Sequence, residues 1–454
     1  MPYEWESVRR GGGGERRLLS TGVAELDEVL GGYPEGAVVV VAGNPGSGKT
    51  TLAAQFIYAG LVRGEPGLYV SLSERKEEFL EHMKRLGMDF EAYERRGLFK
   101  FLWLPLASEA RRVASAIVEA VGESKCKRLV VDTVTPILAS LGPGAGREFL
   151  HNLVNLCLKP ARVTTLLLAE LPYRSETIGF GFEEFVADAI IALSYEEYRG
   201  LTRRVLEVRK CRWCPLPRMG YEFVIGDGGV RLYISYAGSL KGSFRLEERL
   251  STGLRELDEM LGGGIPRGAV VLIAGPSGTG KTLLALSMAI AEARRGGRPL
   301  YVSFEESVEQ IEYVAKKMGL EGGVKVVSLS PRLFTPGSLY YCAVKMLEDC
   351  KPTLVVVDGI SALERQFGEE AVELVRSVTM WAKARGITHV LTSVSDVLEG
   401  ETTGISTVAD VVIALGFERE HGRLRRILTV VKARGIKHDT RLRELVIEEE
   451  IKLR

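Results

Sequence analysis

The sequence predicts an α/β protein of two tandem domains, each a mostly parallel sheet with helices on both faces and antiparallel hairpins at its C-terminal end. Three observations predict this fold: an internal repeat, buried-strand patterns that alternate with helical ones, and a length of 454 residues. Residues 20–50 and 251–282 are nearly the same segment written twice, about 230 residues apart. A chain this long exceeds one hydrophobic core, so we expect domains at residues 15–240 and 246–454.

Each repeat begins with the same order of segments. Ser-Thr-Gly is followed by Glu-Leu-Asp-Glu, Leu-Gly-Gly and a turn with proline, and an apolar run then leads into a glycine-rich loop. The apolar run, at residues 37–42 and 269–274, predicts a buried strand. The apolar periodicity after each loop predicts helices at residues 52–62 and 283–293.

The later segments of each repeat also match in order. They are continuous valine-rich and leucine-rich runs of strand length, which is typical of buried parallel strands. Their alternation with helical stretches indicates βαβ units. The predicted strands lie in residues 67–74, 127–133, 163–170 and 186–193 of the first copy and 299–306, 352–359, 388–395 and 408–415 of the second.

The end of each repeat alternates apolar and polar residues. This pattern predicts antiparallel hairpin strands, and it covers residues 203–210, 221–234, 425–432 and 443–450. Glycine and serine interrupt the periodicity at residues 236–248, where we place the seam between the domains.

The composition is that of an ordinary soluble globular protein, with 46% apolar and 26% charged residues. A net charge of +1 gives no overall basic field for a phosphate backbone, so nucleic acid is not the favoured partner. No apolar run approaches the ~20 residues of a membrane helix, and the amino terminus lacks the apolar core of a signal peptide. We therefore expect a cytoplasmic protein without a membrane segment.

Two minor features concern the source of the protein and its thiols. Three asparagines and three glutamines beside many charges are typical of a thermophilic source. Cys211 and Cys214 have the spacing of half a zinc site, but no second such pair or paired histidines complete it. A packed or reactive pair is the alternative that we favour.

Both glycine-rich loops match the motif G-x-x-x-x-G-K-[ST] of the P-loop, which binds nucleotide phosphates. Glycines let successive N–H groups point at phosphate oxygens, and the helix that follows adds the positive end of its dipole. The lysine reaches the β and γ phosphates, and the threonine hydroxyl binds Mg²⁺. With the residue after each motif, the predicted nucleotide-binding residues are Gly43, Asn44, Pro45, Gly46, Ser47, Gly48, Lys49, Thr50, Thr51, Gly275, Pro276, Ser277, Gly278, Thr279, Gly280, Lys281, Thr282 and Leu283.

Acidic residues follow two strands of each copy. Asp132 and Asp358 end buried strands, where a carboxylate is needed beside the threonine hydroxyl to hold the Mg²⁺ of a bound nucleotide. A helix N-cap is the alternative role for each aspartate. With Thr50 and Thr282 these aspartates are the predicted metal residues.

Hydrolysis also needs a group that orients or deprotonates water. Glu305 and Glu306 end the strand after the second P-loop helix, and the matching residues of the first copy are Ser73 and Glu74. One carboxylate is thus missing there, and the first site is expected to hydrolyse more slowly or to depend on Glu74 alone. Solvent-facing carboxylates at a strand end are the alternative. The predicted catalytic residues are Glu74, Glu305, Glu306, Lys49 and Lys281.

With these residues in place, the chain resembles the tandem RecA-like ATPases of the KaiC family over nearly its whole length. The doubled Ser-Thr-Gly and Leu-Gly-Gly segments, the P-loops, the Glu-Glu strand end and residues 430–439 carry the resemblance. It implies a homo-oligomeric ring, usually a hexamer, with ATP and Mg²⁺ at the subunit interfaces. It also implies partner proteins of unknown identity.

The resemblance further implies residues that act on the neighbouring subunit's nucleotide. A Lys-x-Arg pair corresponds to Lys432 and Arg434, and in the first copy to Lys210 and Arg212. His438 and Asp439 follow the second pair, whereas the first copy has Leu216 and Pro217 there, which puts its nucleotide contacts in doubt.

One implied role concerns phosphorylation of the chain itself. Ser406 and Thr407 match the residues that the family's clock protein autophosphorylates, and Glu401 replaces a third phosphoacceptor. Hydroxyls that flank or cap the following strand are the alternative that we favour.

Three functions are consistent with these features. The first is a regulatory ATPase that forms a ring, with autokinase activity in the second domain as a further expectation. The second is a DNA-handling ATPase of recombination or repair, similar to RadA-type recombinases or DnaB-type helicases. The third is a scaffold in which one domain binds ATP mainly to hold the ring together.

Overall fold

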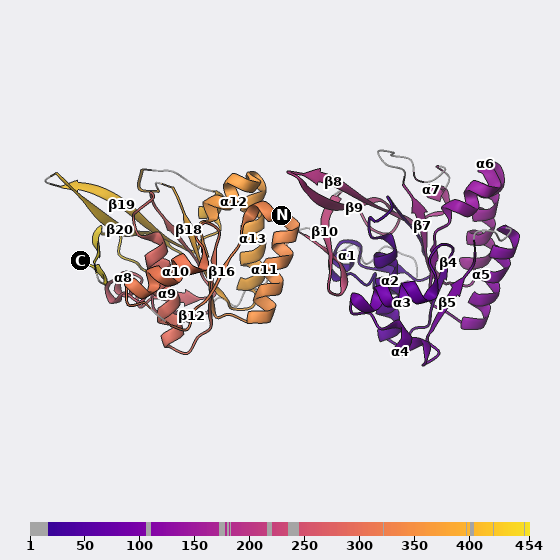
Figure 1. Cartoon of the computed structure of the whole chain (residues 1–454), viewed down its shortest axis with the longest axis horizontal. Helices are drawn as coiled ribbons and strands as arrows, with labels where there is room; N and C mark the ends of the chain where they lie inside the picture. The colour runs from indigo at the N-terminus through magenta and orange to yellow at the C-terminus, as the bar shows by residue number, and fades with distance from the viewer. Residues whose placement is uncertain are drawn as a thin grey trace. The chain divides into compact units, whose positions relative to one another are not determined.

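The chain divides into two compact units, residues 1–234 and residues 235–454 (Figure 1). The computed structural model describes residues 17–105, 110–171, 178, 181, 183–215, 220–234, 245–320, 322–395, 397–399, 404–420, 422–448 and 450–454. Each unit has its own sheet and its own cores, and each is described by itself.

Among the described residues, the first unit has one nine-stranded sheet in the order β11-β10-β9-β8-β3-β7-β6-β4-β5. Strands from β8 to β5 pair in parallel, and β9, β10 and β11 continue the sheet as antiparallel hairpins. The strands are β3 (Val38–Gly43), β4 (Gly67–Ser71), β5 (Phe99–Trp103), β6 (Arg128–Asp132), β7 (Thr164–Glu170), β8 (Ala189–Tyr198), β9 (Leu201–Cys211), β10 (Gly220–Gly226) and β11 (Gly229–Leu232). A two-stranded sheet of β1 (Leu18–Leu19) and β2 (Tyr33–Pro34) precedes it.

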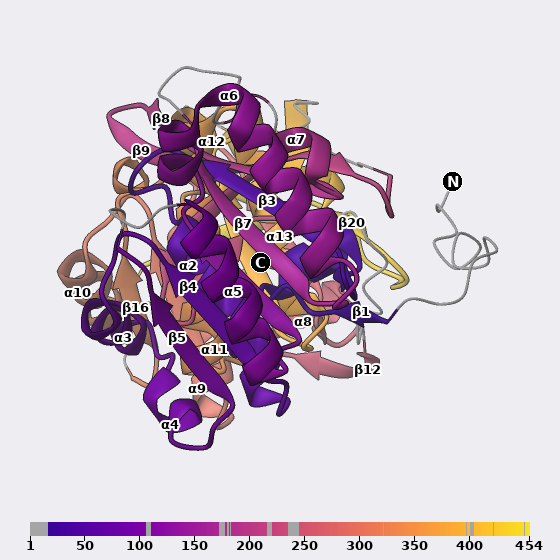
Figure 2. The same ribbon diagram turned by 90° about the vertical axis from the view of Figure 1, so that its right-hand side faces the viewer.

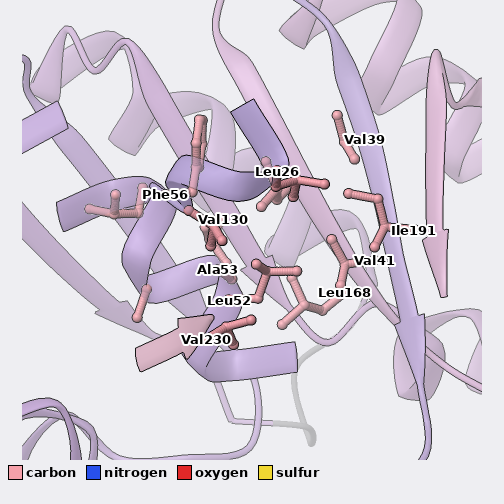
Figure 3. Packing of buried hydrophobic residues seen from close by; sticks show 14 of the residues in the cluster. Leu26, Val39, Val41, Leu52, Ala53, Phe56, Val130, Leu168, Ile191 and Val230 are labelled. Carbon is pink, nitrogen blue, oxygen red and sulfur yellow. The ribbon is translucent and has the colours of Figure 1, made fainter. Parts of the chain in front are cut away.

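Helices cover both faces of this sheet because β3 is apolar on both sides. Val39 and Val41 pack in the core beneath α2, whereas Val38 and Val40 belong to the core on the opposite face (Figure 3). Figure 2 looks onto α5 and α6, which cover that opposite face. The described helices are α1 (Ala24–Leu30), α2 (Lys49–Val62), α3 (Lys76–Arg85), α4 (Phe90–Glu94), α5 (Ala110–Ser124), α6 (Thr135–His151), the π-helix η2 (Asn152–Leu158) and α7 (Glu183–Val186).

The second unit repeats this topology. Its described strands form a nine-stranded sheet in the order β16-β15-β17-β18-β14-β19-β20-β21-β22, again parallel up to β19 and antiparallel after it. The strands are β14 (Val270–Ala274), β15 (Pro299–Ser303), β16 (Lys325–Ser328), β17 (Leu354–Asp358), β18 (Thr388–Ser393), β19 (Val411–Glu420), β20 (Arg423–Ala433), β21 (Arg443–Ile447) and β22 (Ile451–Leu453). β12 (Arg245–Leu250) and β13 (Ile265–Arg267) form a separate antiparallel pair.

Most described helices of the second unit follow the same order as those of the first. The described helices are α8 (Arg255–Met260), α9 (Lys281–Arg294), α10 (Val308–Lys317), α11 (Pro336–Cys350), α12 (Ile360–Phe367), α13 (Glu369–Lys383) and the 3₁₀ turns η3 (Pro331–Leu333), η4 (Val397–Glu399) and η5 (Gly404–Thr407). α12 and α13 stand in the place of α6 and η2, and α4 has no described counterpart. The predicted fold class, with parallel sheets, helices on both faces and C-terminal antiparallel hairpins, is confirmed in both units.

The helices after the two loops begin earlier than the apolar pattern predicts. They start at Lys49 and Lys281 instead of Leu52 and Leu283. In both, the preceding glycine is the N-cap residue with φ of 102°. Apolar periodicity alone misses this first turn because Lys49, Thr50, Lys281 and Thr282 are polar.

Strand β6, which ends in Asp132, is anchored at its other end by a buried ion pair. Arg128 is fully buried, and its Nε donates to Glu65 Oε2 at 2.9 Å. The guanidinium also donates to the carbonyl oxygens of Ser20 and Phe56, both at 2.8 Å. Breaking such a pair is costly because the remaining charge stays buried without its counterion.

Glu65→Gln is therefore expected to lower the free energy of unfolding of the first unit by about 3–5 kcal/mol. The matched control is Glu81→Gln, which removes an exposed i,i+4 pair with Arg85 and is expected to cost about 0.5 kcal/mol or less. Chemical denaturation that follows the first unit's transition measures both. Equal effects of the two variants would contradict the structural role of the buried pair.

Candidate functional site

Each glycine-rich loop joins the carboxyl end of the central strand to the helix that follows. In the first unit Gly46 and Gly48 have φ of 74° and 102°, and in the second Gly278 and Gly280 have φ of 82° and 102°. A Cβ at Gly48 would lie 2.8 Å from Ile225 Cδ1, so a larger residue would be strained and crowded. This backbone curl and the start of α2 or α9 are the features that turn amide N–H groups toward a bound phosphate.

The lysine of each motif is folded over its own loop. Lys49 Nζ donates to the carbonyl oxygens of Gly43 and Asn44, at 2.8 and 3.0 Å. Lys281 Nζ donates to the equivalent oxygens of Gly275 and Pro276, at 2.8 and 2.9 Å. Partial burial lowers the pKa of both ammonium groups, and nearby carboxylates oppose that change. The two lysines therefore place a positive charge in the mouth of each loop.

The remaining motif residues divide by exposure. Pro45 and Ser277 lie on the exposed crest beside Gly46 and Gly278, and Ser47 and Thr279 are buried beneath it. The Asn44 side chain donates to the Leu171 carbonyl at 2.7 Å, which ties the loop to the end of β7. In the helices, the side chain of Thr51 is buried and that of Leu283 is half-buried.

A carboxylate, a tyrosine and a threonine meet beside the first loop. Asp132 Oδ2 accepts hydrogen bonds from Thr50 Oγ1 at 2.9 Å and from the Tyr69 hydroxyl at 2.6 Å. Burial raises the pKa of Asp132, and the two hydrogen bonds oppose that rise. Hard oxygen ligands of this kind suit Mg²⁺ that also binds nucleotide phosphates. Neither Asp132 nor Asp358 caps a helix, because the N-cap residues of α6 and α12 are Val134 and Gly359.

The second unit repeats the cluster with one difference. The Tyr301 hydroxyl donates to Asp358 Oδ2, and Thr392 Oγ1 donates to the other carboxylate oxygen at 2.5 Å. Thr282 lies close enough to Tyr301 to influence its hydroxyl, whose pKa is raised mainly by burial and by the charge of Asp358.

The two tyrosines are not among the residues predicted from the sequence. Tyr69 and Tyr301 occupy the same place in the segments Gly-Leu-Tyr-Val-Ser and Pro-Leu-Tyr-Val-Ser. Their identity at matched positions of the repeat was the available signal. Its meaning depends on the pairing of β4 with β6 and of β15 with β17, which brings each tyrosine beside the aspartate.

The glutamates after β4 and β15 lie in matching turns. The backbone N–H of Glu74 donates to Ser71 Oγ at 3.0 Å, and that of Glu306 donates to Ser303 Oγ at 2.9 Å. Burial raises the pKa of both carboxyls, and the charge of the nearby aspartate adds to the effect. Within the described chain, the buried Oε2 of Glu306 has no hydrogen-bond partner.

Glu305 differs from Glu306 because it forms an ion pair. Its Oε1 lies 2.5 Å from the Arg365 guanidinium of α12, and both side chains are exposed. In the first copy the matching residue, Ser73, is exposed. Glu306 and Glu74 are thus the equivalent half-buried carboxylates of the two units.

The basic pairs lie at the ends of β9 and β20. Lys210 Nζ donates to the Glu184 carbonyl at 2.8 Å, and Arg212 donates to Asp188 Oδ1 at 3.0 Å. In the second unit Arg434 lies 3.8 Å from Asp410, and both basic side chains also donate to backbone carbonyls. Lys432 Nζ donates to the Ser406 carbonyl at 3.0 Å, and Arg434 donates to the Thr407 carbonyl at 3.1 Å.

These pairs are placed at the edge of the sheet opposite the P-loop of the same unit. Asp188 Oδ2 accepts from the N–H of Val38, the first residue of β3, at 3.0 Å, and Asp410 Oδ2 does so from Val270 of β14. Each P-loop begins at the other end of that strand. A strand rises ~3.3 Å per residue. The length of the P-loop strand therefore separates the basic pair of one unit from the loop of the same unit.

Local hydrogen bonds hold the other residues that the resemblance implies. His438 Nδ1 is 3.2 Å from the Ile436 carbonyl, and Arg441 donates to both oxygens of Asp439, which lowers the pKa of that carboxyl to about 2. Ser406 and Thr407 end η5, where Thr407 Oγ1 donates to the Gly404 carbonyl at 2.7 Å.

Three residues named from the resemblance lie outside the described part of the chain. They are Glu401, Leu216 and Pro217.

Among the described residues, no helix is long and apolar enough to cross a membrane.

Both units have the features of a RecA-like P-loop ATPase. Each has a P-loop at the end of a central parallel strand, an aspartate at the end of another strand in the same sheet, and a C-terminal antiparallel extension. The family model of the KaiC ATPases matches residues 19–236, 250–323 and 334–452. The chain belongs to the KaiC family.

Curated relatives agree over nearly the full length. The circadian clock protein KaiC3 of Synechocystis sp. is 30% identical over 95% of this chain and 90% of its own. The circadian clock oscillator protein KaiC of Thermostichus vulcanus is 29% identical over 99% and 91%. The protein of the same name from Parathermosynechococcus lividus is 31% identical over 94% and 83%.

Tyr301→Phe tests the aspartate cluster of the second unit. Loss of a hydrogen bond to a charged group costs about 1.5–3 kcal/mol, and about 1.4 kcal/mol corresponds to a tenfold change in affinity. We expect Mg-nucleotide binding at the second site to weaken about tenfold or more. Calorimetric titration measures it, with the exposed Tyr313→Phe as control; unchanged affinity would exclude this role for the tyrosine.

Proposed function

We propose that the protein is a regulatory ATPase that forms a homo-oligomeric ring, with six subunits as the expected number. It binds and hydrolyses ATP at two sets of sites, which we call the first tier, made by the first units, and the second tier, made by the second units. The observation that carries this proposal is the position of the basic pairs. In each unit the P-loop lies at the carboxyl edge of the sheet and the Lys-x-Arg pair lies at the amino edge. A nucleotide that contacts both cannot lie within one unit, and we infer that it lies between two subunits.

The P-loop amides and Lys49 or Lys281 are proposed to hold the phosphates of ATP. Thr50 with Asp132, and Thr282 with Asp358, supply the oxygens that suit Mg²⁺, which neutralises developing phosphate charge when bound. The neighbouring subunit contributes Lys210 and Arg212 or Lys432 and Arg434, with His438 and Asp439 beside the latter. An arginine supplied in this way accelerates phosphoryl transfer by about 10³–10⁵.

Glu306 and Glu74 are proposed as the groups that accept a proton from the attacking water. Both have a raised pKa, and the unpartnered Oε2 of Glu306 leaves an oxygen free for that water. Glu305 is proposed as a positioning residue because Arg365 holds it. Since the first copy has Ser73 in its place, we expect the first tier to turn over more slowly and to contribute more to assembly.

A regulatory role is supported by the relatives, which are named as clock proteins. A DNA-handling motor is less well supported because the net charge is only +1, which gives no overall basic field for nucleic acid. We expect the protein to act in the cytoplasm of a thermophile, through protein partners.

Autokinase activity in the second tier is a second candidate function. The carbonyl oxygens of Ser406 and Thr407 accept hydrogen bonds from Lys432 and Arg434. Their hydroxyls therefore lie close to the basic pair that is proposed to contact the neighbouring nucleotide. Phosphate transfer to them would have to come from that neighbour, because their own P-loop lies at the far edge of the sheet.

Mixed rings test whether the sites are shared between subunits. Lys281→Ala and Arg434→Ala chains are each expected to lack turnover in the second tier. When they are co-expressed with different tags and purified through both, the intact loop of one faces the intact arginine of the other. We expect ATP turnover above that of either variant alone, and mass spectrometry of the same rings tests Ser406 and Thr407 for phosphate. A mixture no more active than its components would contradict shared sites.

The pH dependence of turnover tests Glu306. A base must be deprotonated to act, and a raised pKa means that it takes up its proton at a higher pH than an ordinary glutamate. In a Glu74→Gln chain, we expect turnover to fall as the pH is lowered through this raised pKa. Glu306→Gln in the same chain is expected to lower turnover by about 10²–10⁴ and to abolish this acid limb. An acid limb that survives the substitution would assign it to another group.

A further inference from the structure

Two thiols that the proposed function does not use flank Arg212 in the first unit. Cys211 is the last residue of β9, and Cys214 follows three residues later. Their Sγ atoms lie 2.6 Å apart, both side chains are half-buried, and both cysteines are free thiols. A bonded pair has its sulfurs about 2.0 Å apart, so only a small side-chain adjustment separates the two states.

The turn that carries the thiols is fixed on both sides. Cys211 pairs with Ala189 in the ladder between β8 and β9, and the N–H of Arg212 donates to the Asp188 carbonyl at 3.0 Å. The Trp213 indole donates to the Leu30 carbonyl at 3.0 Å. Both cysteines and Trp213 pack against the core beneath α2. The proximity of the sulfurs is therefore a property of the folded turn and not of two mobile side chains.

The two thiols have unequal acidity, as a nucleophile and its resolving partner require. The hydrogen bond from Cys214 lowers the pKa of Cys211 to about 7, although burial opposes the shift. The same interaction, with burial, raises the pKa of Cys214. Cys211 is thus the more acidic of the two thiols, which suits it to the role of nucleophile. A zinc site is not supported, because the described residues contain no group of three or more histidine, cysteine or acidic side chains that could hold a metal ion.

We propose that Cys211 and Cys214 form a redox-active dithiol that a disulfide oxidant converts reversibly into a disulfide, closing a four-residue ring around Arg212. The Cys211 thiolate attacks one sulfur of the oxidant and expels the first thiolate, giving a mixed disulfide. Cys214 then loses its proton, attacks Cys211 Sγ and expels the second thiolate. The protein loses two electrons and two protons overall, and the oxidant is reduced to two thiols.

The consequence for the ring rests on the proposed function. The Arg212 side chain is held on its own chain by Asp188, and its backbone N–H is held by the Asp188 carbonyl; contact with a neighbouring phosphate requires the side-chain pair to open and the backbone beside it to adjust. A disulfide across the turn restricts that change, so oxidation slows turnover in the first tier. The second tier has an internal control, because Ala433 and Ile436 occupy the positions that match the two cysteines.

Thiol mapping of the full chain tests the site without reference to ATP turnover. After incubation with oxidised glutathione, we expect the peptide with Cys211 and Cys214 to lose two hydrogens and to resist alkylation, and dithiothreitol to reverse both changes. Cys214→Ser is expected to stop at a mixed disulfide or free thiol, whereas Cys157→Ser behaves as the unsubstituted chain. Two thiols that both remain open to alkylation after oxidation overturn the proposal.

Turnover then tests the link to Arg212. In a Lys281→Ala chain, which reports the first tier, we expect a several-fold loss of ATP turnover on oxidation, recovery on reduction, and no response when Cys214→Ser is added. A disulfide that forms without changing turnover refutes the link. A reduced Lys281→Ala chain without any turnover instead contradicts the proposed first-tier hydrolysis, and the thiol mapping still decides whether the dithiol exists.

Discussion

The direction of the parallel strands is the constraint on which the rest of the structure depends. A strand such as β3 has its carboxyl end at one edge of the sheet, where the P-loop begins, and its amino end at the other. Asp188 and Asp410 link the N–H at the start of each P-loop strand to the arginine at the end of the adjoining hairpin. Each unit therefore carries its P-loop and its basic pair at opposite ends of these strands, and the proposed nucleotide site combines the loop of one unit with the basic pair of another.

The two units share this frame but differ where chemistry takes place. The strand order is the same in both sheets, and the lysine, tyrosine and aspartate of each site match in position. The second unit has the additional Glu305, whereas the first has Ser73 there and the dithiol around Arg212. The two units thus share the residues proposed to hold phosphate and differ in residues proposed to set the rate.

Much of the fold and of the loops could be predicted because the signals are local. A continuous apolar run, a glycine-rich loop and an apolar helix follow one another within a short stretch of sequence, so β3, α2 and the P-loop were predictable. The aspartate that ends β6 was predictable for the same reason. The helix start at Lys49 was not, because capping by Gly48 depends on backbone geometry and not on apolar spacing.

Features made by long-range contacts could not be predicted in this way. Tyr69 acquires its partner only because β4 and β6 are neighbours in the sheet, although other segments separate them in sequence. The ion pair between Glu305 and Arg365 also joins distant segments. The spacing of Cys211 and Cys214 was visible, but a zinc half-site and a reactive pair have the same spacing. Only the fixed turn brings their sulfurs together.

Native mass spectrometry with saturating Mg-ATP tests most directly whether one unit's loop and another subunit's basic pair form each site. The account predicts a closed ring of identical subunits that retains nucleotide at both tiers, and loss of nucleotide from one tier when Lys49 or Lys281 is replaced by alanine. A protein that stays monomeric under these conditions, or that retains no nucleotide, would contradict it.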